Sequence, residues 1–238
     1  MSGPGAMFAV LLAAGAIAPQ QPAFGGGPDR AAAPPHAAEL SAAGSAAPRP
    51  SIRKRLIPYG AKRKRDMAGY SKRHYGQNTW RLRDPKLIVI HYAVAGSVSA
   101  IYNTFAPNRP DVEYRELPGV CSQYAVSSKG NSVRFVPDSI RCRHVVGLNH
   151  VSIGIEHVGF SDRDVLRNKR EFRGSLRLTR WLRCRHGIPV KGVIGHAESL
   201  SSRFYKELDP DFRGRTHSDF RRASMRIYRR ELRELGPC

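Results

Sequence analysis

A short apolar run that leads to a histidine occurs twice in this sequence and constrains the fold more than any other feature. Leu87 to Ile90 is a continuous, mostly β-branched run that follows a proline and leads to His91. Val190 to Ile194 repeats the arrangement and leads, after Gly195, to His196. Both runs are typical of buried central strands. Two imidazoles at the ends of two buried strands can face the same cleft.

A third segment, Ser152-Ile-Gly-Ile-Glu156, adds a carboxylate. Period-two alternation predicts Ile153 and Ile155 on the core face, and Ser152, Gly154 and Glu156 on the other face. The small residues leave room in front of the sheet, where Glu156 could meet a bound substrate. A carboxylate there can take a proton from water and pass it to a leaving group. The alternative role for Glu156 is an ion pair with one of the many arginines.

The fourth segment, Thr216-His217-Ser218-Asp219, precedes an amphipathic stretch predicted to be a helix over 220–235. The sequence has no His-Glu-x-x-His and no Cys-x-x-Cys, so zinc ligands would have to converge from separate elements. Asp219 has an alternative role as the N-cap of that helix. Asp209 precedes Pro210 and is most simply a turn residue.

These four segments, in this order, resemble zinc-dependent N-acetylmuramoyl-L-alanine amidases of the phage lysozyme-like and peptidoglycan recognition protein family. The likeness runs from about Leu87 to Asp219 and includes Arg143-His-Val-Val-Gly-Leu-Asn149. Ile57-Pro-Tyr-Gly and Tyr70-Ser-Lys-Arg-His-Tyr-Gly extend it upstream, as in secreted actinobacterial members. The resemblance implies an α/β fold whose mixed central sheet is flanked by helices, with a zinc groove on the sheet face.

The resemblance also implies roles for individual residues. Zn²⁺ would be bound by His91, His196 and Asp219, and Glu156 and His217 would be catalytic. In the family the third ligand lies two residues after a catalytic Lys or His, and His217-Ser218-Asp219 keeps that step. Lys206-Glu-Leu-Asp209 has a step of three. Asp209 and His217 remain alternative third ligands.

The implied activity is that of an enzyme, a hydrolase that degrades cell walls by cleaving the amide bond between N-acetylmuramic acid and L-alanine in peptidoglycan. The alternative is a non-catalytic peptidoglycan-binding module, the role of family members that have lost a ligand. Because the ligand set is intact here, the sequence favours the enzyme.

The rest of the chain predicts four parts: a signal-like segment (1–24), a flexible Ala/Pro-rich linker without fixed structure (25–50), a basic N-terminal extension (51–86) and the amidase domain (87–238). The apolar run from Ala6 to Ala18 is too short to span a bilayer and resembles a secretory signal. The protein is therefore expected to be secreted or associated with the cell wall, and not membrane-spanning.

Lys and Arg number 40 against 19 Asp and Glu, which gives a net charge of +21. For a secreted chain, the basic segment between Ser51 and Arg73 would attract anionic cell-wall polymers besides peptidoglycan. A nucleic-acid partner would rest on charge alone and is not expected. Arginines also line the predicted last helix, opposite an apolar face of Ile227, Tyr228, Leu232 and Leu235.

Four cysteines in an exported chain raise the question of disulfides. Cys121 and Cys142 flank a predicted hairpin of Tyr124 to Val126 and Ser132 to Val136, so strand pairing could bring them together. Cys184 falls within a helix predicted over 172–186 and reads as a buried thiol, and Cys238 as a free or intermolecular one. That helix is predicted to face Leu176, Trp181 and Leu182 inward and to end at Gly187.

Overall fold

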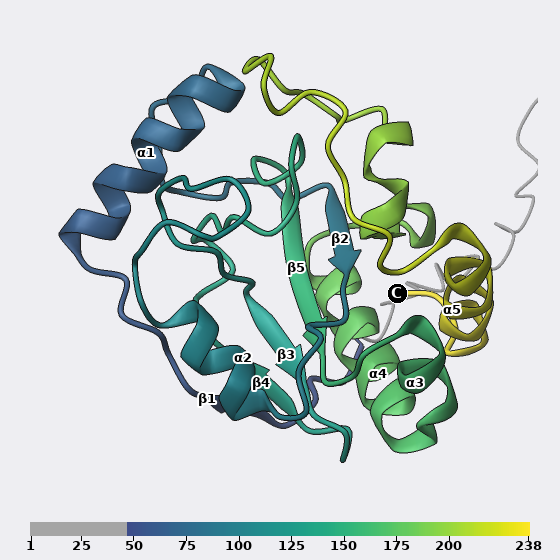
Figure 1. Cartoon of the computed structure of the whole chain (residues 1–238). Coiled ribbons are helices and arrows are strands. Elements are labelled where there is room, and N and C mark those ends of the chain that lie inside the picture. Colours follow the sequence, from purple (N-terminus) through teal and green to yellow (C-terminus); the bar gives the residue numbers. More distant parts are fainter. Residues whose placement is uncertain (1–46) are drawn as a thin grey trace, which may run out of the picture. The chain divides into compact units, whose positions relative to one another are not determined.

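A six-stranded mixed sheet organises residues 47–238, which are the residues described by this computed structural model. The strands lie in the order β1-β4-β3-β5-β2-β6 (Figure 1). Their bounds are Ile52–Lys54 (β1), Leu87–Ile90 (β2), Tyr124–Val126 (β3), Ser132–Arg134 (β4), Ser152–His157 (β5) and Val193–Gly195 (β6). Only β3 and β4 pair antiparallel; the other neighbours are parallel. The predicted mixed α/β fold is confirmed.

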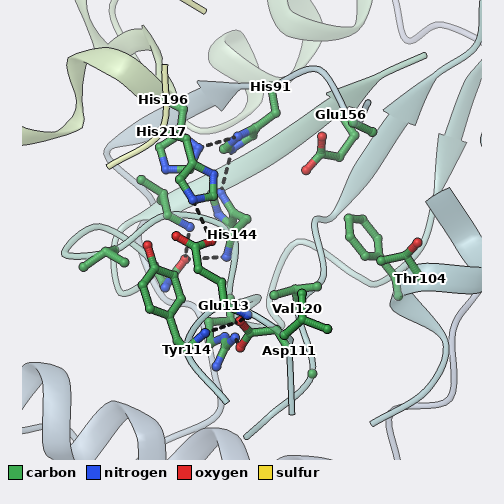
Figure 2. A pocket seen from close by; sticks show the side chains of 18 of the residues that line it. His91, Thr104, Asp111, Glu113, Tyr114, Val120, His144, Glu156, His196 and His217 are labelled. Atoms are coloured by element: carbon green, nitrogen blue, oxygen red, sulfur yellow. Dashed lines mark hydrogen bonds and ion pairs between the residues drawn. The ribbon is translucent and has the colours of Figure 1, made fainter. Parts of the chain in front are cut away.

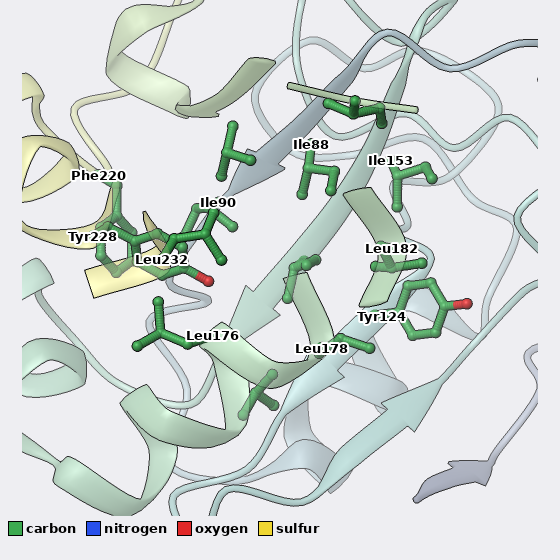
Figure 3. Packing of buried hydrophobic residues seen from close by; sticks show 14 of the residues in the cluster. Ile88, Ile90, Tyr124, Ile153, Leu176, Leu178, Leu182, Phe220, Tyr228 and Leu232 are labelled. Carbon is green, nitrogen blue, oxygen red and sulfur yellow. The ribbon is translucent and has the colours of Figure 1, made fainter. Parts of the chain in front are cut away.

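Within the described residues, five α-helices accompany the sheet: Ala61–Tyr75 (α1), Val98–Phe105 (α2), Asp162–Arg167 (α3), Lys169–Arg185 (α4) and Arg222–Glu234 (α5). The largest apolar cluster joins one face of the sheet to α3, α4 and α5. In that cluster Ile88, Ile153 and Leu182 are buried side by side (Figure 3). A second cluster packs α2 against the other face through Ile101, Ala125 and neighbouring loops. The sheet is thus covered on both faces, which agrees with its continuous apolar strands.

The predicted hairpin and the predicted long helix are both present. β3 and β4 pair around the turn at Gly130, whose φ is 79°. In α4, Leu176, Trp181 and Leu182 are buried as expected. The helix is followed by Gly187 with a φ of 63°, a left-handed conformation that glycine adopts without strain. These two predictions are confirmed.

The strand expected over Val190 to Ile194 begins later. Pro189 is followed by a short 3-10 helix, Val190–Gly192, closed by a hydrogen bond from Gly192 N to the carbonyl oxygen of Pro189 at 2.8 Å. Pairing with β2 therefore starts only at Val193. The prediction was wrong for the first half of this segment because the local turn outcompetes the β-branched propensity.

The buried face of the last helix, α5, differs from the predicted apolar face. Tyr228 and Leu232 are fully buried as expected, together with Met225. Ile227 and Leu235 are 40% and 36% exposed, so their inclusion in the apolar face was wrong. Met225, Tyr228 and Leu232 recur at helical spacing and form one narrow stripe, which Ile227 and Leu235 flank.

All four cysteines form disulfides. Cys121 and Cys142 are joined as expected, across 21 residues. Cys184 is joined to Cys238 across 54 residues, so the predicted buried thiol and free thiol were wrong. The bond is possible because Gly236, with a φ of 86°, turns the chain back toward α4 after α5 ends. There Arg180 donates a hydrogen bond to the carbonyl oxygen of Pro237 at 3.1 Å.

The outer edge of β6 is closed by side chains. Arg229 of α5 donates to the carbonyl oxygen of Val193 at 3.1 Å and to both oxygens of Glu198, at 2.7 and 3.1 Å. Glu198 in turn accepts from the backbone N–H of Gly195 at 3.2 Å. Because β6 pairs with β2 on its other side, these contacts satisfy backbone groups that no strand reaches.

The basic segment 51–86 supplies β1 and α1. Arg63 of α1 is buried and donates to the carbonyl oxygens of Phe105 at 2.8 Å and Gly119 at 2.9 Å. This arginine therefore joins α1 to the end of α2 and to the loop 106–123. The segment belongs to the same compact unit as the rest of the described residues 47–238.

The predicted secretory signal (1–24) and nearly all of the predicted linker (25–50) lie outside the described residues. The domain boundaries at residues 51 and 87 stay a prediction. Within residues 47–238, none of the helices combines the length and the apolar character needed to cross a bilayer.

Glu171 provides a test of the packing of α4. Its side chain is buried at the first turn, and Oε1 has no hydrogen-bond partner there. Burial raises the pKa of Glu171 to about 7. The folded state therefore holds this proton more tightly than the unfolded state, and stability is lost as pH rises from the ordinary range of a carboxyl through 7.

We expect Glu171→Gln to raise the free energy of unfolding by about 2 kcal/mol at pH ~8 and to leave it nearly unchanged at pH ~5. Urea denaturation of both proteins at the two pH values measures this. An equal change in the free energy of unfolding at both pH values would contradict the raised pKa of Glu171.

Candidate metal centre and active site

Strand register places three of the predicted site residues in one row. Ile90 of β2 pairs with Ile155 of β5 on one side and with Gly195 of β6 on the other. The next residues along these three parallel strands are His91, Glu156 and His196. They therefore leave the sheet at the same level and, since the strands are in register, on the same face.

Asp219 reaches this row from the loop before α5. The carbonyl oxygen of Asp219 accepts a hydrogen bond from Ala197 N at 2.7 Å. The loop runs so close to β6 that a Cβ on Gly195 would lie 1.9 Å from the carbonyl oxygen of Phe220. The glycine before His196 is thus required by the approach of the segment that carries Asp219.

Three donor atoms converge at this point. His91 Nδ1 lies 3.1 Å from His196 Nδ1 (Figure 2). Asp219 Oδ2 lies 3.0 Å from His91 Nδ1, and Asp219 Oδ1 lies 3.2 Å from His196 Nδ1. The edge of a tetrahedron of zinc ligands is about 3.3 Å, given zinc–nitrogen bonds of about 2.0–2.1 Å. All three residues are buried, and the group could hold a metal ion.

The protonation of His196 and Asp219 also suits a metal. Burial alone would lower the pKa of His91, but the carboxylates of Glu156 and Asp219 outweigh it and raise that pKa. Burial lowers the pKa of His196 to about 4, so this imidazole is neutral at pH 7. Burial alone would raise the pKa of Asp219, but hydrogen bonds from His196 and His91 outweigh it and hold that pKa far below its usual range. Neutral imidazoles and ionised carboxylates are the forms that bind metals.

His144 supports the ring of His91 and was not singled out from the sequence. Nε2 of His91 lies 3.0 Å from Nδ1 of His144, and Nε2 of His144 lies 3.3 Å from the hydroxyl of Ser152. Ser152 donates onward to the carbonyl oxygen of Leu148 at 2.8 Å. Because Ser152 donates its proton onward, it accepts from Nε2 of His144, and Nδ1 of His144 in turn accepts from Nε2 of His91.

In the sequence, Gly154 is the residue that could have indicated a bulky side chain packed against this strand, which is that of His144. A Cβ at position 154 would lie 2.9 Å from the His144 ring. The alternation predicted for this strand is confirmed, since Ile153 and Ile155 pack in the cluster with α4. The room in front of Gly154 is occupied by the imidazole, so the expectation that it is open to substrate was wrong.

Glu156 lies beside His91 at the wall of a cavity of about 440 Å³ (Figure 2). Its side chain is buried, and burial raises its pKa to about 7, while the neighbouring His91 acts in the opposite direction. A carboxyl group with this pKa can exchange a proton with a reacting group near neutral pH.

His217 lies over the same cavity. Its ring is tilted against that of His196 at 4.8 Å between centroids, and its side chain is 48% exposed. Nε2 lies 2.9 Å from the carboxylate of Glu113, which comes from the loop 106–123 on the other side of the opening. Glu113 was not anticipated, because nothing in the sequence relates it to a residue more than a hundred positions away.

Asp209 is separate from the three converging donors. Its carboxylate accepts a hydrogen bond from the backbone N–H of Asp211 at 3.0 Å, and its carbonyl oxygen accepts from Phe212 at 3.2 Å. These are the contacts of a turn residue.

Comparison with known proteins gives one family. The sequence matches the family described as N-acetylmuramoyl-L-alanine amidase over residues 81–212, more than half of the chain. The match begins after α1 and ends before His217 and Asp219. A search of curated protein sequences gives no match.

Solved structures of similar fold have low sequence identity. The catalytic domain of PlyG is 16% identical with a TM-score of 0.51, and the match covers 79% of this chain and 99% of that one. An AmpD structure is 17% identical with a TM-score of 0.48, covering 74% and 93%. The endolysin N-acetylmuramoyl-L-alanine amidase LysCS from Clostridium intestinale URNW is 14% identical with a TM-score of 0.45, covering 79% and 97%. The likeness to PlyG supports the fold.

Gly195→Ala tests the approach of the loop that carries Asp219. The added methyl group would overlap a backbone carbonyl that cannot rotate away, so we expect a loss of about 1–3 kcal/mol in the free energy of unfolding. Gly60→Ala is the matched control, because nothing lies within 4 Å of its Cβ position. Similar urea midpoints for the two variants would show that the loop yields freely.

Proposed function

This chain belongs to the N-acetylmuramoyl-L-alanine amidase family, and from this premise we propose that it is a zinc hydrolase acting between N-acetylmuramic acid and L-alanine in peptidoglycan. The observation that carries the proposal is the convergence of His91, His196 and Asp219 at the wall of a cavity shared with Glu156. His91, His196 and Asp219 would hold the metal, with the imidazoles bound through Nδ1. Zinc with three protein ligands supplies an open position at which water is acidified and a carbonyl is polarised.

Glu156 is proposed to move the proton. It is next to His91 in the row of strand ends, and its pKa of about 7 lets it accept a proton from water and deliver it to the departing amide nitrogen. Within residues 47–238, no protein group donates a hydrogen bond to the carboxylate oxygens of Glu156. The carboxylate is therefore available for this proton exchange.

His217 is proposed to hold the substrate oxygen. Its ring lies beside His196 and its position over the cavity allows an N–H to point at a carbonyl that turns negative during attack. The carboxylate of Glu113, 2.9 Å from Nε2, orients this imidazole.

We further propose that the protein is secreted or associated with the cell wall. Two disulfides support an oxidising compartment. Exposed cations of the basic segment, among them Arg53, Lys54 and Arg65, would attract anionic cell-wall polymers by a field that weakens with salt. Arg63 takes no part, because it is buried.

Digestion of purified cell walls tests the activity. We expect new L-alanine amino termini and no new reducing sugar ends, since an amide rather than a glycosidic bond is cut. Glu156→Gln should keep its zinc and lower kcat by about 10²–10⁴-fold, because the amide cannot accept the proton. New reducing ends in the wild-type digest would mean a glycosidase.

Metal analysis of variants tests the ligands. The purified protein should contain about one zinc per chain, held by two imidazoles and one carboxylate. His196→Ala and Asp219→Ala should lose both zinc and activity, whereas Asp209→Ala and His217→Ala should retain zinc. If Asp219→Ala kept its zinc while either of the other two lost it, the third ligand would have to be reassigned.

A further inference from the structure

His74 occupies a position that the proposed chemistry does not use. It lies in the last turn of α1, a helix outside the part of the chain that matches the family, and its side chain is 0% exposed. Its ring is stacked on Tyr70 at 3.9 Å between centroids, and Phe212 packs edge-on against it at 4.7 Å.

Both ring nitrogens of His74 face carboxylates. Nδ1 lies 2.9 Å from Glu207 Oε1, and Nε2 lies 3.1 Å from both oxygens of Glu116. An ionised carboxylate only accepts hydrogen bonds, so each ring nitrogen has to donate. Two donating nitrogens mean that the ring is an imidazolium, with a negative group on either side.

The two carboxylates belong to different loops. Glu116 lies in the loop 106–123, which also carries Glu113, and Glu207 lies in the loop 202–221, which also carries His217. The two loops meet a second time at the opening of the cavity, through the contact of 2.9 Å between Glu113 and His217 (Figure 2). His74 therefore joins the same two loops that the contact between Glu113 and His217 also joins.

We propose that His74 is a positioning residue: as an imidazolium it clasps the loops 106–123 and 202–221 together and so fixes the walls of the reaction cavity. Its effect on catalysis rests on the proposed function, whereas its effect on the loops does not. The clasp weakens when the ring loses a proton, because a neutral imidazole can donate to only one of the two carboxylates.

The groups around His74 determine whether the clasp is lost as pH rises or as pH falls. Burial would lower the pKa of His74, but hydrogen bonds to Glu116 and Glu207 outweigh it, and the pKa is raised. The other ionisable groups that face this cluster are Tyr70, Arg73 and Tyr75 of α1, Arg143 of the loop after β4 and Arg213 of the loop 202–221. Arg73 and Arg143 contact Glu116, and Arg213 donates to the carbonyl oxygen of Glu207 at 3.3 Å. A raised pKa means that the clasp is complete below the ordinary imidazole range and is lost as pH rises through the raised value.

Hydrogen exchange of the intact protein measures the clasp without reference to activity. After correction for the intrinsic exchange rate, we expect both loops to be about tenfold better protected at pH ~5.5 than at pH ~8.5, since one hydrogen bond between charged groups changes an equilibrium constant by about tenfold or more. In His74→Gln this pH dependence should vanish and both loops should exchange as the wild type does at high pH. His186→Gln is the matched control, because His186 pairs with one carboxylate, Asp138, outside these loops.

Glu207→Gln keeps an oxygen that accepts the hydrogen bond from Asp209 N but removes one negative charge beside His74. This variant tests the proposal if His74→Gln does not fold. The same loss of protection in both loops is expected. If the folded variants showed the same amide protection in both loops as the wild type, the proposal would be overturned. An equal loss of amide protection throughout the sheet would also overturn it, because that result indicates a general loss of stability.

The catalytic readout is the pH profile. For cell-wall digestion, kcat/KM of His74→Gln should be about tenfold below wild type at pH ~5.5 and should approach it at pH ~8.5, whereas the ratio for His186→Gln should stay flat. A constant ratio for His74→Gln would overturn the effect on catalysis. A wild-type protein without activity would contradict the proposed function and leave the exchange result as the test of the clasp.

Discussion

Parallel pairing of β5, β2 and β6 in a single register is the constraint on which the site depends. It brings His91, Glu156 and His196 to one level on one face, although they are separated by up to 105 positions in the sequence. Backbone hydrogen bonds hold this alignment, and burial of the alternate apolar side chains of these strands selects it. A slip of one residue in either pairing would turn the affected side chain to the face covered by α4.

The sequence was informative where local pattern and fold agree. Continuous apolar runs identified β2, alternation identified β5, and the glycine at position 187 marked the end of α4. Prediction from the sequence failed where a contact with a distant segment determines the local structure. The turn at Pro189, the disulfide of Cys184 and the imidazole over Gly154 all depend on partners that periodicity does not reveal.

Buried charge organises the part of the cavity wall that lies away from the sheet. The loop 106–123 has few apolar anchors and is held by the guanidinium of Arg63 on one side and by His74 on the other. Removing one member of such a set leaves its partners unpaired in the interior, at a cost larger than the contact itself contributes. From the sequence Arg63 was only part of a basic run and His74 only part of a segment that resembles the family, because burial of a cation cannot be read from charge pattern.

The contacts of Arg229 and Glu198 have a consequence for association. An edge strand with free N–H and C=O groups can be extended by a strand of another molecule. At β6 the carbonyl of Val193 and the N–H of Gly195 are already bonded to side chains. Sheet-to-sheet growth is therefore blocked at the edge nearest His196, so that a high local concentration of the protein does not join its sheets into fibres through β6.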